Sequence, residues 1–218
     1  ILKHVLRASG INCVLDVGAN RGQYGKALRD MDYRGWICSF EPVESNLAEL
    51  REAASRDARW RVFPFALGAA DARTTINVTE RTVFSSFLQP RTDSQARFPT
   101  NRVLRTEQVE IRRLDDVFDS CLSGIEAPRV YLKMDTQGFD LEVVKGARAV
   151  LERVEALQTE VSFRGIYSGM PGFVESIEML RSCGFDVVDF LSVTSEAESL
   201  CAIEMDCVMA RRFSATSA

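Results

Sequence analysis

Five acidic residues stand at or near the ends of apolar, strand-like runs: Asp16, Glu41, Asp135, Glu160 and Asp206. Carboxylates at the edge of a sheet can remove a proton from a weak nucleophile, accept hydrogen bonds from ribose hydroxyls or hold a hard cation such as Mg²⁺. The single histidine, His4, lies in a segment expected to be a helix at the surface. If His4 is remote, the general base must be a carboxylate.

A glycine-containing turn follows the first acid, in the segment Asp16-Val17-Gly18-Ala19-Asn20-Arg21-Gly22-Gln23. A strand that turns through glycine into a helix places backbone N–H groups at the edge where open α/β sheets bind ligands. Asn20 replaces the middle glycine of a dinucleotide fingerprint, which makes a poorer pyrophosphate cradle. The spacing suits a nucleoside with an amino-acid tail, whose ammonium group Asp16 can face. The alternative is that Gly18 and Gly22 only permit close packing of helix on strand.

A nucleoside needs partners for its ribose and its base. Glu41 lies roughly 20 residues beyond the glycine turn, where an acid accepts hydrogen bonds from ribose hydroxyls. The alternative is that Glu41 is a solvated loop residue that binds no ligand. Ala66 and Leu67 follow an expected strand at 60–65 and are placed to border an adenine. The predicted cofactor-binding residues are Asp16, Gly18, Asn20, Gly22, Gln23, Glu41, Pro42, Ala66, Leu67 and Ser86.

Asp135 is the first candidate for the general base because it ends the apolar run 130–134, in the middle of the expected sheet. Glu160 is the second candidate. Asp135 has two alternative roles, a hydrogen bond to the cofactor and a cap on the next helix. Lys133 shares a strand face with Asp135 and is expected to pair with it or with Asp16. Asp135, Glu160 and Asp206 together could also hold one Mg²⁺, which would orient an acceptor oxygen.

The surrounding pattern predicts the elements that position these residues. Apolar runs predict strands at 13–17, 36–40, 60–65, 130–135, 156–161, 185–191 and 204–210. Helices are expected at 2–8, from 23, from 45, from 114 with Asp115 as its cap, from 140 through 151, and through 174–183. This alternation predicts an α/β, doubly wound, seven-stranded and mostly parallel sheet. No helix separates the last two strands, so the last strand should be antiparallel.

Two further strands, 74–79 and 109–112, flank a polar segment at 84–106. Long loops in compact domains are usually functional. We therefore expect this segment to be a lid over the site, hinged at Ser85 and Ser86. The loop containing Tyr167 is expected to help select the acceptor.

Bulk properties set the remaining limits. A length of 218 residues predicts one domain, 1–218, and 46% hydrophobic with 27% charged residues is typical of a soluble globular protein. A net charge of −4 argues against a nucleic-acid surface. No apolar run is long enough to span a membrane. The six cysteines form no C-x-x-C pair and predict reduced thiols in the cytoplasm. The oligomeric state is left open.

In order and spacing, the motifs resemble the FkbM family of S-adenosylmethionine (AdoMet)-dependent methyltransferases. They are D-V-G-A-N-R-G-Q at 16–23, S-F-E-P at 39–42, A-L-G at 66–68, S-S-F at 85–87, R-L-D-D at 113–116, L-K-M-D-T-Q-G-F-D at 132–140, and Met205-Asp206. The resemblance implies a class I Rossmann-like methyltransferase fold and O-methylation of sugars or polyketide-derived products. Many members carry valine-glutamate-glycine where this chain has Thr136-Gln137-Gly138, which puts a catalytic role for position 137 in doubt.

These observations predict an AdoMet-dependent O-methyltransferase that acts on a hydroxyl of a sugar, a glycolipid or a secondary metabolite. An NAD(P)-dependent oxidoreductase is disfavoured because the third glycine of its fingerprint and a Tyr-x-x-x-Lys donor are missing. A catalytically inactive AdoMet-binding module stays open as an alternative. The identity of the acceptor cannot be read from the sequence.

Overall fold

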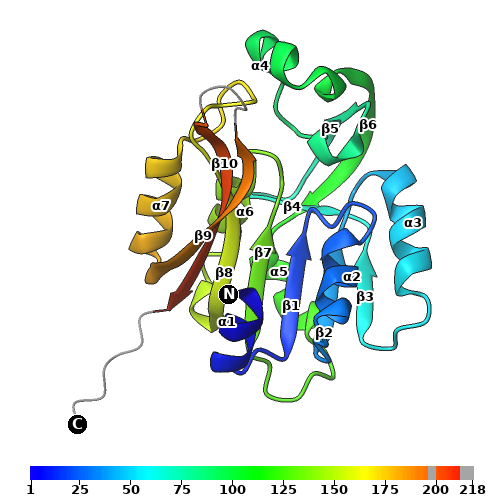
Figure 1. Cartoon of the computed structure of the whole chain (residues 1–218). Helices are drawn as coiled ribbons and strands as arrows, with labels where there is room; N and C mark the ends of the chain where they lie inside the picture. Colours follow the sequence, from blue (N-terminus) through cyan, green and yellow to red (C-terminus); the bar gives the residue numbers. More distant parts are fainter. Residues whose placement is uncertain (196–199, 212–218) are drawn as a thin grey trace.

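A seven-stranded sheet forms the centre of the computed structural model, which describes residues 1–195 and 200–211 (Figure 1). The strand order is β3-β2-β1-β7-β8-β10-β9. The bounds are Trp60–Phe63 for β3, Trp36–Phe40 for β2, Cys13–Val17 for β1, Val130–Met134 for β7, Val154–Ser162 for β8, Ala202–Arg211 for β10 and Phe185–Ser195 for β9. β10 runs antiparallel to both of its neighbours, β8 and β9, whereas the other neighbouring strands of this sheet pair in parallel. The predicted fold class is therefore confirmed.

Helices cover both faces of this sheet. One face carries α1 (Leu2–Ala8), α2 (Gln23–Asp30) and α3 (Glu44–Ala54), and the other carries α5 (Leu114–Cys121), α6 (Asp140–Lys145) and α7 (Phe173–Ser182) (Figure 1). Each layer has its own apolar core, the first around Leu28 and Leu50 and the second around Leu132 and Phe118. The strands between the two layers are buried on both faces, as their continuous apolar runs predict.

A second sheet of three strands, in the order β4-β6-β5, stands above the carboxyl ends of the main sheet (Figure 1). Its strands are β4 (Ala66–Leu67), β6 (Val103–Arg112) and β5 (Ala72–Thr79). The expected strands 74–79 and 109–112 belong to β5 and β6, which pair antiparallel. Residues 74–79 lie opposite 103–109, however, and only Thr74 meets the expected partner segment, at Val109. The expected strand 60–65 ends at Phe63, and Ala66–Leu67 pair with β6 instead. Pro64 has no N–H group to donate, so it breaks the ladder between the two.

The expected lid at 84–106 has more structure than a loop. It contains α4 (Thr92–Arg97), a 3₁₀ turn at Pro99–Asn101 and the first residues of β6, after an earlier 3₁₀ turn at Thr82–Phe84. Backbone hydrogen bonds join it to the loop after β8, from Arg91 N to Ile166 O and from Ser168 N to Gln89 O, each 2.9 Å long. The segment is thus docked over the carboxyl edge of the sheet.

Two helix details differ from the sequence prediction. Helix α5 begins at Leu114, so Arg113 and not Asp115 is its N-cap, and the Asp115 carboxylate accepts a hydrogen bond from Ala149 N at 2.9 Å. Helix α6 ends at Lys145, and Leu151 lies in a separate 3₁₀ turn, Leu151–Arg153. The close approach of Gly146 to the backbone of Gly68 marks the end of α6, since a Cβ on Gly146 would lie 1.9 Å from Gly68 O.

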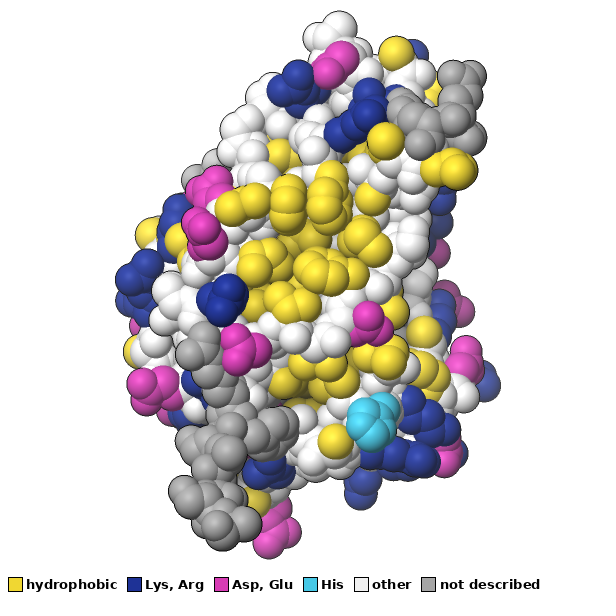
Figure 2. All heavy atoms as spheres, turned by 60° about the vertical axis from the view of Figure 1, so that its left-hand side comes forward, with side chains coloured by type: hydrophobic (Ala, Val, Ile, Leu, Met, Phe, Trp, Pro, Cys, Tyr) yellow, Lys and Arg dark blue, Asp and Glu magenta, His cyan; other side chains and the backbone are white. Residues whose placement is uncertain are grey.

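One face of the molecule carries a broad apolar area. Figure 2 brings forward the side that carries β9, β10 and α7, and apolar side chains gather there between charged ones. Exposed apolar residues of the edge strand β9 are Val187, Val188, Phe190 and Val193. None of them lines the cavity described below. Among the residues that the structure describes, no helix is long and apolar enough to cross a membrane.

Candidate active site

A cavity of about 460 Å³ lies at the carboxyl ends of β1, β2 and β7, where open α/β sheets bind their ligands. Seven of the ten predicted cofactor-binding residues line it: Gly18, Asn20, Gln23, Glu41, Pro42, Ala66 and Leu67. Asp135 and Asp206 line it as well. Asp16, Gly22, Ser86 and Glu160 are not among its lining residues, and each has a structural reason to lie behind the wall.

The turn between β1 and α2 packs directly against the turn after β7. Gly18 has φ +76°, and a Cβ there would lie 2.1 Å from the carbonyl oxygen of Asp135. Gly18 is therefore required both by its conformation and by this contact. Gly22 has φ +81° and faces away from the cavity, since a Cβ there would lie 3.0 Å from Leu50 and 3.2 Å from Trp60. For Gly22 the packing interpretation is the one that the structure favours.

Glu41 is buried in the wall of the cavity, with 4% of its surface exposed. Its Oε2 accepts a hydrogen bond from Asn20 N and its Oε1 accepts one from Val43 N, both at 2.8 Å. It thereby ties the glycine turn to the end of β2. Oε1 also accepts a hydrogen bond of 3.4 Å from Asn46 Nδ2, so Oε2 is the oxygen that retains a lone pair for a ligand hydroxyl. Burial raises the pKa of Glu41 to about 7, against the opposing effect of these hydrogen bonds.

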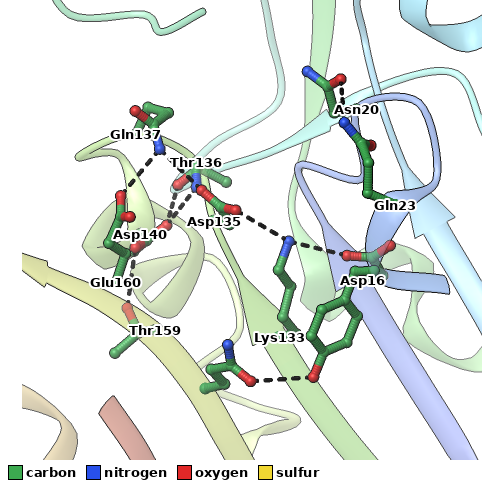
Figure 3. A network of polar contacts seen from close by, with 12 residues as sticks. Asp16, Asn20, Gln23, Lys133, Asp135, Thr136, Gln137, Asp140, Thr159 and Glu160 are labelled. Atoms are coloured by element: carbon green, nitrogen blue, oxygen red, sulfur yellow. Dashed lines mark hydrogen bonds and ion pairs between the residues drawn. The ribbon is translucent and has the colours of Figure 1, made fainter. Parts of the chain in front are cut away.

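Lys133 holds two acids of the site together. Its Nζ lies 3.2 Å from Asp16 Oδ1 and 3.4 Å from Asp135 Oδ2 (Figure 3). Asp16 is fully buried, so the ammonium group that it faces is that of Lys133. Burial would lower the pKa of Lys133, but the charges of Asp16 and Asp135 raise it above its ordinary value. Asp16 therefore contributes to the cavity by holding the ammonium group of Lys133 in place.

Asp135 is the acid of this group that reaches open space, with 42% of its side chain exposed. Its Oδ1 accepts a hydrogen bond of 3.0 Å from Gln137 Nε2. The same nitrogen donates to Glu160 Oε2, also at 3.0 Å (Figure 3). Glu160 therefore lies behind Gln137, and its burial raises its pKa well above the ordinary value.

Ser86 and Tyr167 are both buried and hold the surrounding loops. Ser86 Oγ donates a hydrogen bond of 2.8 Å to the backbone oxygen of Gln137. The Tyr167 hydroxyl lies 2.8 Å from both Gln137 Oε1 and Phe84 O. The two serines of the predicted hinge therefore lie beside the turn after β7, with Ser85 in the cavity wall and Ser86 behind it.

Sequence reasoning missed several polar residues of the cavity. Tyr24, Thr82 and Gln158 line it. The Tyr24 hydroxyl donates a hydrogen bond of 3.1 Å to Gln158 Oε1. Tyr24 follows the glycine motif directly and Gln158 alternates with Glu160 on its strand, but neither position carries a signal specific to a site.

The fit of these acids to Mg²⁺ is poor. Asp206 and Glu160 face each other across β10 and β8. The Oδ1 of Asp135 and the Oε2 of Glu160 both contact the Gln137 amide, however, and Lys133 contacts the Oδ2 of Asp135. Among residues 1–195 and 200–211, no three histidine, cysteine or acidic side chains are placed to hold a metal ion. These residues therefore do not fit the predicted ion.

Glu204 adds a further buried acid on β10, and one of its carboxylate oxygens has no hydrogen-bond partner in the described structure. Burial, with the charges of Asp135, Asp140 and Asp206, raises its pKa from 4.5 to about 8. The folded protein therefore holds this proton more tightly than the unfolded chain. The free energy of unfolding should consequently fall as pH rises from about 4.5 through about 8.

Glu204→Gln should remove much of this pH dependence, since the amide resembles the protonated acid. We expect a melting temperature close to that of the original protein at pH 5 and a higher one at pH 8. Thermal unfolding at the two pH values, without ligand, measures the effect, and the exposed Glu126→Gln serves as a control. Equal pH dependence in all three proteins would contradict the prediction.

The doubly wound sheet with antiparallel β10 and a glycine-and-acid cavity at its carboxyl edge define a class I methyltransferase. A model of the methyltransferase FkbM domain matches residues 16–187. The chain belongs to this family and is an AdoMet-dependent methyltransferase. This identification confirms the predicted family and sets aside the oxidoreductase alternative.

Two known proteins illustrate the relationship. A 2-O-methyltransferase of Sinorhizobium fredii, NoeI, is 25% identical over 176 residues, which are 78% of this chain and 71% of the relative. The magnesium protoporphyrin IX methyltransferase of Synechocystis, solved with bound AdoMet, has a TM-score of 0.51 and 10% identity. That match covers 97% of this chain and 76% of the other. The second likeness shows the fold alone.

Proposed function

We propose that this enzyme transfers the methyl group of AdoMet to a hydroxyl of a sugar, a glycolipid or a secondary metabolite, with Asp135 as the general base. The observation that carries the proposal is that one cavity joins Glu41, the glycine turn and the exposed carboxylate of Asp135. The 2-O-methyltransferase relative supports a hydroxyl acceptor. A net charge of −4 supports a small molecule or glycan over a nucleic acid. Buried thiols such as Cys13 and Cys38 support a cytoplasmic location.

The residues present fit AdoMet. Glu41 would accept hydrogen bonds from the ribose hydroxyls, and Ala66 and Leu67 would contact the adenine. The turn from Gly18 to Asn20 would lie along the amino-acid tail. When bound, AdoMet supplies a methyl group that an oxygen lone pair can displace from sulfur in line. An alcohol oxygen is a weak nucleophile, so the chain must remove its proton. Asp135 accepts that proton, and Lys133, whose Nζ lies 3.4 Å from Asp135 Oδ2, holds the carboxylate in place.

Transfer of labelled methyl from AdoMet tests the proposal. Sugars, glycolipids and polyketide-derived alcohols serve as candidate acceptors, each beside a deoxy analogue that lacks the target hydroxyl. We expect label in the hydroxyl compound alone and one equivalent of S-adenosylhomocysteine (AdoHcy) per methyl. Binding of AdoHcy without transfer to any acceptor would favour the alternative of an inactive binding module.

The same assay tests the role of Mg²⁺. Because the acids of the site do not fit this ion, we expect the same turnover in EDTA and in millimolar Mg²⁺. Loss of transfer in EDTA, with recovery on adding Mg²⁺, would restore the sequence prediction that Asp135, Glu160 and Asp206 hold a cation.

A further inference from the structure

Gln137 lies at the centre of the contacts that hold the proposed base. It lines the cavity and is buried, with 8% of its surface exposed. Its side-chain nitrogen lies between two carboxylates, 3.0 Å from Asp135 Oδ1 and 3.0 Å from Glu160 Oε2. We propose that Gln137 is the positioning residue of the base, and that its amide takes the place of a cation between Asp135 and Glu160. The inference rests on the role of Asp135 proposed above.

The first step of the argument is orientation. Gln137 contacts Oδ1 of Asp135 and Lys133 contacts Oδ2, so the two oxygens are held from opposite sides (Figure 3). A carboxylate fixed at both oxygens cannot rotate freely, and general-base catalysis depends on such alignment. The amide also donates one hydrogen bond to each of the two carboxyl groups, which holds them at a fixed separation.

The second step is the rigidity of Gln137 itself. It adopts φ +55°, a conformation that costs free energy for a residue with a side chain. Two contacts besides those to the acids hold it there, and the second is itself anchored to the segment that covers the site. Ser86 Oγ donates to its backbone oxygen, its Oε1 lies 2.8 Å from the Tyr167 hydroxyl, and Tyr167 also reaches Phe84 O. The amide is thus fixed by the segment that covers the site.

The third step is that the Gln137 amide stands between the two acids where a cation could otherwise stand. Two acids on neighbouring strands normally need a shared proton, a cation or a donor between them. The –NH₂ group of Gln137 has two protons and can serve both acids at once. A carboxylate at the same position would replace these donors with a third acceptor, and three carboxylates around one point can bind Mg²⁺.

Gln137→Met tests positioning, because it keeps the approximate length of the side chain and removes both donors. We expect kcat to fall by about 10- to 100-fold, in line with the cost of a misplaced catalytic group. The KM for AdoMet should stay nearly unchanged. An unchanged kcat, or a KM for AdoMet that rises as much as kcat falls, would overturn the inference.

Gln137→Glu tests whether the amide takes the place of a cation, and its readout, the melting temperature, does not require activity. We expect millimolar Mg²⁺ to raise its melting temperature, and to leave those of the original protein and of the exposed Gln108→Glu variant unchanged. If Mg²⁺ raised the melting temperature of the original protein, or did not raise that of Gln137→Glu, the claim that the amide takes the place of a cation would be overturned. Failure of the proposed function is distinguishable, because it would leave the original protein without methyl transfer while these melting temperatures can still be measured.

Discussion

Replacing Asp135 with asparagine should lower kcat for methyl transfer by about 10²- to 10⁴-fold, the usual contribution of a general base. Asparagine has nearly the size of aspartate, but its amide cannot take the proton from the hydroxyl that is methylated. The affinity of the variant for AdoHcy should change little, because the proposed cofactor contacts lie on Glu41, Ala66 and the glycine turn. Steady-state transfer rates and calorimetric titration with AdoHcy give the two quantities separately.

Asp119→Asn is the matched control, since Asp119 has an 83% exposed side chain far from the cavity. It should retain full transfer. If Asp135→Asn also kept its rate within about threefold, Asp135 would not be the base. Asp206 would then be the next acid to examine, because it lines the same cavity and its pKa is raised to about 6, first by burial and then by Asp135.

Replacing Glu41 with alanine should weaken AdoHcy binding by about 10- to 100-fold, as expected for the loss of the hydrogen bonds between the ribose and this carboxyl group. The variant removes the proposed ribose contact and also leaves Asn20 N and Val43 N without their partner. Calorimetric titration of the variant measures the change. The neighbouring, exposed Glu44→Ala should bind AdoHcy as the original protein does.

A truncated ligand separates the direct contact from damage to the turn. The original protein should bind 2′-deoxy-AdoHcy more weakly than AdoHcy, because the deoxy ligand lacks one ribose hydroxyl. In Glu41→Ala the two ligands should bind almost equally, since coupling between the removed groups is lost. If the difference in affinity between AdoHcy and 2′-deoxy-AdoHcy were the same in the variant as in the original protein, Glu41 would not contact the ribose.

The fold was largely predictable because local patterns determine it. Continuous apolar runs predicted the buried strands, and the missing helix between the last two strands predicted the antiparallel β10. The prediction failed where tertiary pairing decides. Ala66–Leu67 follow β3 without interruption in hydrophobicity, yet Pro64 diverts them to pair with β6. The segment at 84–106 looked like a loop because its polar residues carry no period, although α4 and β6 occupy part of it.

The site was predictable where a residue type is tied to a strand end. Gly18, Glu41 and Asp135 all line the cavity for that reason. Asp16 was expected to face a ligand, and the sequence could not show whether Lys133 or a ligand would be its partner. Gln137 was discounted because it lacks an acid, whereas its amide is the group that contacts two acids. Such a role depends on distances between strands, which sequence spacing does not contain.

The structure of this enzyme with AdoHcy bound tests the central claim most directly, because it shows where the product lies relative to the two acids. The account predicts AdoHcy in the cavity between the glycine turn and the second sheet. Its ribose hydroxyls should lie within hydrogen-bonding distance of Glu41, with the sulfur facing the open side of Asp135. AdoHcy bound elsewhere, or in the cavity with its sulfur turned away from Asp135, would contradict it.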